Sequence, residues 1–155
     1  MKTKLNLGLV LLILFSSCGI GIKEDLDFKI KLETSIKLKM ETEADSIISI
    51  YNITTFEWEE MYIFTPYTGI DSINSRLGFT WYGAKKTHIY QDDGINLLVF
   101  VKDERVVSYS RFPRDLGDFI KVESSGPFTK DQSIFVIREE PYGGQNWIFL
   151  SLDVD

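Results

Sequence analysis

The sequence predicts an α+β domain, mainly an antiparallel β-sheet arranged as a meander, with one short helix on one face. An almost continuous apolar run, Ile95–Val101, is followed by a polar turn and the alternating segment Val106–Phe112, which together predict a central hairpin. The helical pattern is confined to Ile70–Leu77 and ends at Gly78. A chain of 155 residues is long enough for one domain with its own core.

The first part of the domain is predicted to be β-structure. From Phe28 to Met40 all but one of the even positions are apolar, and the odd positions are Lys, Glu or Ser. This period of two predicts a long, half-exposed strand at a sheet edge. Ile47–Ile50 predicts a second short strand. Met61–Phe64 predicts a buried strand that ends before Pro66, because proline cannot donate to a strand ladder.

The middle of the chain predicts the helix and the rest of the meander. Thr68-Gly-Ile-Asp71 is typical of a capping box, so Ile70–Leu77 is expected to be the only substantial helix of the domain. Lys85–Gln91 is predicted to be a strand joined to the central hairpin through Asp92-Asp-Gly94, with Gly94 at positive φ. Val107 and Tyr109 are expected to share one face of their strand.

The last part predicts a weak strand and a second hairpin. Phe119–Glu123 is the weak strand, and Ile134–Ile137 and Trp147–Leu152 are the arms of the hairpin. Tyr82 and Tyr142 lie beside glycine-containing loops, so we expect both side chains to be exposed.

The amino terminus has the layout of a secretory signal. A short basic start is followed by the apolar run Leu5–Phe15 and then by small residues before Cys18, the only cysteine. The run is shorter than the roughly 20 residues that a permanent membrane-spanning helix needs. An ordinary signal peptide with a chance cysteine, or a buried helix, is the alternative.

The stretch Phe15-Ser-Ser-Cys18-Gly19 resembles the lipobox of bacterial lipoproteins. This resemblance implies a signal peptide over residues 1–17, a lipidated tether over 18–27 with lipid on Cys18, and one domain over 28–155. Gly19 resembles the pattern of lipoproteins sent to an outer membrane, and Lys23-Glu-Asp25 resembles the surface-export signal of Bacteroidota lipoproteins. The expected location is therefore the bacterial envelope, on the periplasmic or the surface-exposed face of the outer membrane. A solvated, charged tether is the alternative reading of Lys23–Asp25.

A second resemblance concerns the domain itself. The block Trp58–Thr68, the helix end Arg76-Leu-Gly78, the strand Leu98–Val101 and the stretch Arg111-Phe-Pro113 resemble a small domain of uncharacterised bacterial lipoproteins. The resemblance implies a family but no activity.

Charge and residue types exclude several function classes. Without residues 1–17 the chain has 15 basic and 23 acidic residues, a net charge of −8, which argues against a nucleic acid partner. His88 is the only histidine, so a multi-histidine metal site is excluded. The acidic pairs could serve a carboxylate-dependent hydrolase, but a turn and solvated flanks also explain them. No catalytic residue, metal or cofactor is predicted.

Function is therefore predicted to lie on the surface, at the loops Gly83-Ala84, Pro113–Gly117 and Pro141–Asn146. Arg114 and Tyr142 are the side chains there best suited to anchor a partner. A salt-bridged turn is the alternative role of the loop around Arg114. The leading prediction is a non-enzymatic binding or accessory module that contacts an envelope protein or glycan. A carboxylate-dependent hydrolase and an inhibitor or immunity-type lipoprotein are the alternatives.

Overall fold

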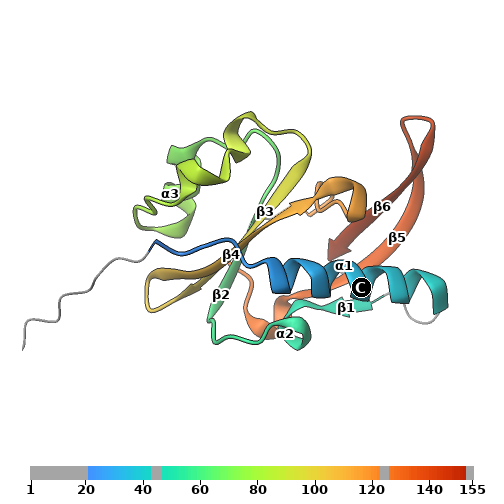
Figure 1. The fold of residues 1–155 in the computed structure, drawn as a ribbon, viewed down its shortest axis with the longest axis horizontal. Coiled ribbons are helices and arrows are strands. Elements are labelled where there is room, and N and C mark those ends of the chain that lie inside the picture. Colours follow the sequence, from blue (N-terminus) through green and yellow to red (C-terminus); the bar gives the residue numbers. More distant parts are fainter. Residues whose placement is uncertain (1–20, 43–46, 123–125, 153–155) are drawn as a thin grey trace, which may run out of the picture.

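The computed structural model describes residues 21–42, 47–122 and 126–152 (Figure 1). Two three-stranded antiparallel sheets have the strand orders β1-β5-β6 and β2-β3-β4, which confirms the predicted α+β class with mainly antiparallel sheet. The strands are β1 (Ile47–Ser49), β2 (Glu60–Phe64), β3 (Ile95–Lys102), β4 (Arg105–Pro113), β5 (Ile134–Tyr142) and β6 (Gln145–Leu152). The helices are α1 (Leu26–Thr42), α2 (Ile50–Ile53) and α3 (Ile70–Leu77), with the 3₁₀ helices η1 (Ala84–Thr87), η2 (Ile89–Gln91), η3 (Arg114–Leu116) and η4 (Lys130–Gln132).

The β3–β4 hairpin forms as predicted, but only β3 is the middle strand of its sheet, and β4 lies at the sheet edge. Leu98 and Phe100 of β3 face the first core, which lies between this sheet, α1 and the β1-β5-β6 sheet. Leu97 and Val99 face the second core, which α3 and the 3₁₀ segment cover. Because both faces of β3 are covered, its sequence is apolar at nearly every position.

A β-bulge in this hairpin corrects the predicted faces of β4. The register shifts between Phe100, which pairs with Ser108, and Val101, which pairs with Val106. Val107 is therefore left without a partner in β3 and is exposed, whereas Tyr109 is buried. The extra residue of a bulge reverses the alternation of the strand, so Val107 and Tyr109 do not share a face.

The predicted strand Phe28–Met40 is wrong, since this segment is most of α1. Two residues in a helix are about 200° apart, so a period of two places alternate apolar residues on opposite sides of the helix. One set, Phe28, Leu32 and Ile36, is buried, while the other set remains exposed. The Asp25 carboxylate accepts the N–H of Phe28 at 2.9 Å, and this bond begins the helix.

The predicted helix Ile70–Leu77 is confirmed as α3, and Gly78 ends it at φ 78°. The predicted capping box is wrong, because Gly69 is the N-cap and no side chain caps the helix. The hydroxyl of Thr68 donates instead to the carbonyl of Thr65 at 2.6 Å. With 17 residues, α1 is longer than α3, so α3 is not the only substantial helix.

The segment Lys85–Gln91 is not a strand but lies in η1 and η2, so β2 takes the third place in the meander. His88 has φ 58° between the two 3₁₀ helices, and this left-handed conformation interrupts an extended chain. Gly94 does not have positive φ; its N–H donates to the Asp92 carboxylate at 2.9 Å. The described part of Phe119–Glu123 is a turn, in which the N–H of Val122 donates to the carbonyl of Phe119.

The β5–β6 hairpin is confirmed and is longer than predicted. Its strands extend to Tyr142 and Gln145 and are joined by Gly143-Gly144, with φ 61° and 84°. Positive φ at both positions suits a two-residue hairpin turn. The hairpin projects from the body, and its tip lies at the opposite end of the long axis from the blue segment that leads into α1 (Figure 1).

No helix within the described ranges is long and apolar enough to cross a membrane.

Candidate functional site

The structure places both residues predicted to anchor a partner, Arg114 and Tyr142, beside Trp147. The guanidinium of Arg114 lies over the Trp147 ring at 5.9 Å from its centroid. The Tyr142 ring centroid is 6.2 Å from that of Trp147. Arg114 belongs to η3, directly after the central hairpin, whereas Tyr142 and Trp147 belong to the projecting hairpin. The site therefore lies where the two hairpins meet.

Asp118 holds this junction together. Its carboxylate is fully buried and accepts hydrogen bonds from Arg114 Nε at 2.8 Å, Asn96 Nδ2 at 3.2 Å and Trp147 Nε1 at 3.3 Å. Its backbone N–H donates to the carbonyl of Ile148, and its carbonyl accepts the N–H of Leu150. One residue therefore joins β3, η3 and β6. We call these four side chains (Asn96, Arg114, Asp118 and Trp147) the Asp118 clamp.

The clamp changes the role expected for Arg114. Its hydrogen bond to Asp118 raises the pKa of the guanidinium, with burial acting in the opposite direction, so Arg114 is charged at any physiological pH. Arg114 Nη2 is 2.7 Å from the carboxylate, and Nη1 donates to the carbonyl of Asp93 at 2.9 Å. The loop is thus a salt-bridged turn, and Arg114 supports the junction. A direct contact of Arg114 with a partner stays a prediction.

Aromatic side chains line the projecting hairpin beyond the clamp. Tyr142 is 57% exposed, as expected, and its ring packs at 5.8 Å against Phe149, which is buried. Lys121 lies 4.1 Å from the centroid of the Phe149 ring and forms an ion pair with Glu140. We call the distal hairpin, residues 138–148, the arm. Its exposed aromatic ring rests on a packed base, which is a favourable setting for a contact residue.

The backbone edges of the arm are open among the described residues. Strand β1 pairs with β5 only through Ile134–Val136. On the other side, β6 meets only the isolated bridge between Asp118 and Phe149. Beyond these points each strand of the arm is paired only with the other strand. Such edges can accept a further strand, although Pro141 and two glutamates make the β5 edge the less suitable one.

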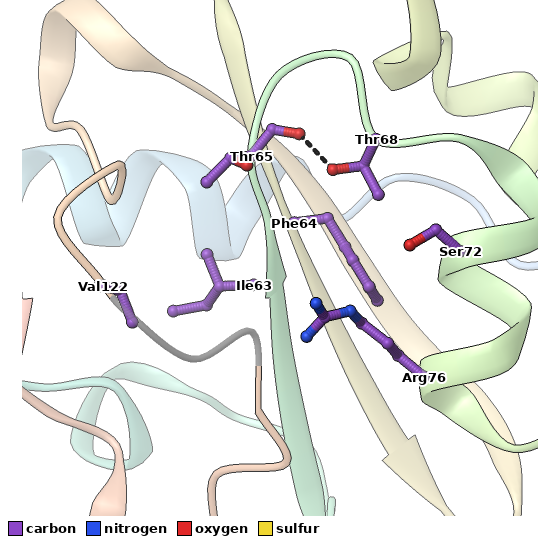
Figure 2. Close-up of a pocket in the computed structure, with 7 residues that line it drawn as sticks. All are labelled: Ile63, Phe64, Thr65, Thr68, Ser72, Arg76 and Val122. Atoms are coloured by element: carbon purple, nitrogen blue, oxygen red, sulfur yellow. Dashed lines mark hydrogen bonds between the residues drawn. The ribbon is translucent and has the colours of Figure 1, made fainter.

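A small pocket lies on the other side of the central sheet, between the end of β2 and α3 (Figure 2). It has a volume of about 170 Å³ and is lined by three apolar residues and by Thr65, Thr68, Ser72 and Arg76. Ligand sites usually have roughly 300 Å³ or more, so this pocket is smaller than a typical small-molecule site.

The other residues considered for chemistry lie apart from one another. His88 is exposed, and its Nδ1 is 3.1 Å from Gln91 Nε2. Glu59 accepts the backbone N–H of Asp103, Glu60 accepts the hydroxyl of Tyr62, and Asp92 pairs with Arg111. Within the described ranges no three His, Cys, Asp or Glu residues converge as metal ligands. Cys18 lies outside the described residues.

The sequence prediction missed Asp118, the centre of the clamp. A single acidic residue within the apolar stretch Leu116–Ile120, four positions after Arg114, is the available signal, since an aspartate is rarely buried without a partner.

No family model matches the chain, and no curated protein or solved structure shows significant similarity to it.

Proposed function

We propose that this protein is a lipid-anchored component of a bacterial envelope whose domain acts by contact, through the arm. The observation that carries this proposal is the projecting hairpin with exposed Tyr142, held at its base by an ion pair whose carboxylate, from Asp118, is fully buried. A binding residue on a firmly held element loses little conformational freedom on binding, which favours affinity.

The partner that fits the arm best is an envelope protein. Strand addition along the outer edge of β6 would satisfy open backbone groups, and the nearby aromatic ring would provide an anchor. A glycan could stack on Tyr142 but would gain nothing from the strand edge, so it is the second choice. The net acidity of the chain favours a partner with a basic surface.

Lipid anchoring is tested by mass spectrometry of the membrane fraction. A mature chain that begins at an acylated Cys18 is expected, and Cys18→Ser should release the domain from membranes. A soluble parent protein, or a Cys18→Ser variant that still fractionates with membranes, would contradict the anchor.

Contact through the arm is tested with a photo-crosslinking amino acid in place of Tyr142 in the intact envelope. Tyr82 is the matched control, because it is an exposed tyrosine, at 88%, on a different part of the fold. One protein should be captured from position 142 and not from position 82. Capture that is equal from both positions would contradict the proposal, and capture of a glycan alone would replace the protein partner.

A further inference from the structure

Beyond the arm, the entry of the chain into the domain points to a surface that rests on the membrane. The N–H of Asp25 donates to the carbonyl of Tyr109 at 2.8 Å, and Glu24 accepts the N–H of Arg111 at 3.2 Å. The segment predicted as tether is therefore fixed to the open edge of β4 from Glu24 onward. Glu24 is six positions after Cys18, so the two residues are at most about 20 Å apart.

The surface at this entry is apolar and open. Ile22, Leu26 and Val107 are 40%, 58% and 38% exposed, and they line one shallow hollow with Phe56. The bulge in the β3–β4 hairpin is what turns Val107 outward, to the place where the chain enters. Neighbouring exposed aliphatic side chains are typical of a surface that contacts a protein or a membrane.

Two exposed lysines lie beside this hollow. Lys23 is exposed, and a Cβ on Gly21 would lie 3.8 Å from Nζ of the exposed Lys86. Glu24 and Asp25 also line the hollow, and both direct oxygens into the protein, Glu24 to the backbone N–H of Arg111 and Asp25 to Phe28 and Ser108. Asp27 forms an ion pair with Lys31. Lysines beside aliphatic side chains are typical of a surface that contacts anionic phospholipid headgroups.

We infer that Ile22, Lys23, Leu26, Lys86 and Val107 form an entry face that lies against the phospholipid bilayer, an inference that rests on the proposed lipidation of Cys18. The short span from the lipid brings this face to the membrane, and its aliphatic side chains and lysines match the headgroup region. The arm is at the opposite end of the long axis (Figure 1), so this contact points the arm away from the membrane.

The test uses the complete lipoprotein reconstituted into vesicles of phosphatidylethanolamine and phosphatidylglycerol. Because Cys18 is the only cysteine and would be blocked by its lipid, an introduced cysteine is the only free thiol. Leu26→Cys and the control Asn146→Cys on the arm are labelled with a polarity-sensitive dye. The dye at position 26 should shift to the blue and be quenched by spin-labelled lipid, while the dye at position 146 should show neither effect.

A charge variant sharpens the result. Lys23→Glu with Lys86→Glu should reduce the quenching at position 26, and Arg138→Glu, an exposed cation on the arm, should leave it unchanged. Equal, water-like signals at positions 26 and 146 would overturn the membrane contact while leaving the anchor intact. A dye shift at position 26 in native envelopes but not in vesicles would mean that a protein covers the face. Labelling of the parent chain at Cys18 would instead overturn lipidation.

Discussion

The two hairpins of this protein have the same local design but different surroundings. Each has a two-residue turn with positive φ at both positions, Asp103-Glu104 in one and Gly143-Gly144 in the other. The β3–β4 hairpin is covered on both faces by the two cores, whereas the arm of the β5–β6 hairpin extends past its sheet. The two hairpins therefore differ in role because the rest of the chain covers one and leaves the other exposed. The covered hairpin is part of the scaffold, and the exposed one offers a surface for contact.

The largest difference is expected from a core substitution in the central hairpin. Phe100 packs edge-on against Phe28, Phe56 and Trp58, with ring centroids 5.1–5.5 Å apart. Phe100→Ala should lower the free energy of unfolding by about 3–5 kcal/mol, because it leaves a cavity that these rings cannot fill. Chemical denaturation measures the change. A loss below about 1 kcal/mol would show that β3 is not the centre of the core.

The second effect concerns the junction between the hairpins. Asp118→Asn should cost about 2 kcal/mol, because the charge of Arg114 loses its buried partner. The control is Asp115→Asn, an exposed acid in the same loop that should change stability by less than about 0.5 kcal/mol. Protection of the residue-118 and Leu150 amides in hydrogen exchange should fall only in the first variant. Equal effects of the two substitutions would mean that the clamp does not hold the arm.

A smaller effect on stability is expected only in alkaline solution, and it comes from Tyr62 of β2, which pairs with the central hairpin. Burial, followed by the hydrogen bond to Glu60 and its charge, raises the pKa of Tyr62 from 10.0 to about 12. The folded state holds this proton more tightly, so the stabilisation is present below pH 10 and is lost as the pH rises toward 12.

Burial also raises the pKa of Tyr109, so absorbance titration should show late tyrosinate formation that Tyr62→Phe reduces by one residue. Relative to the parent, the stability of Tyr62→Phe should rise through the same pH window. A titration curve that is identical for parent and variant would contradict the raised pKa.

The smallest effect on stability is expected at the tip of the arm. Tyr142→Ala should change the free energy of unfolding by less than about 0.5 kcal/mol, since the side chain is mostly exposed. If Tyr142→Ala also loses binding to the partner that crosslinks at position 142, then Tyr142 serves partner binding and not the stability of the fold. A destabilisation as large as that of Asp118→Asn would assign Tyr142 to the core of the hairpin instead.

The sequence correctly predicted those elements whose hydrophobic pattern fits only one type of secondary structure. The apolar run Ile95–Val101 and the segment Met61–Phe64 became strands, and α3 ended at Gly78. The pattern of Phe28–Met40 has two meanings, since alternate apolar residues fit one face of a strand or two faces of a helix. Whether the segment becomes a strand or a helix depends on the elements that pack against it, and the segment's own sequence does not contain this information.

The candidate site was predictable only in part. Tyr142 could be placed because a glycine turn exposes its neighbours, and its exposure is confirmed. The role of Arg114 could not be read from its loop, because its partner Asp118 is held in place by β3 and β6, which are distant in the sequence. Side-chain networks that join separate elements leave little trace in local periodicity.

The two-sided apolar pattern of α1 has a consequence for the unfolded chain. When Phe28–Met40 is unfolded, an extended conformation gathers all its apolar side chains on one face, so the segment can pair with a second copy. The lysines at its odd positions oppose such pairing by charge repulsion, as gatekeeper residues do. We therefore expect this segment to nucleate aggregation when folding is slow, and Lys-to-Gln exchanges there to increase aggregation during refolding at a small cost to the native helix.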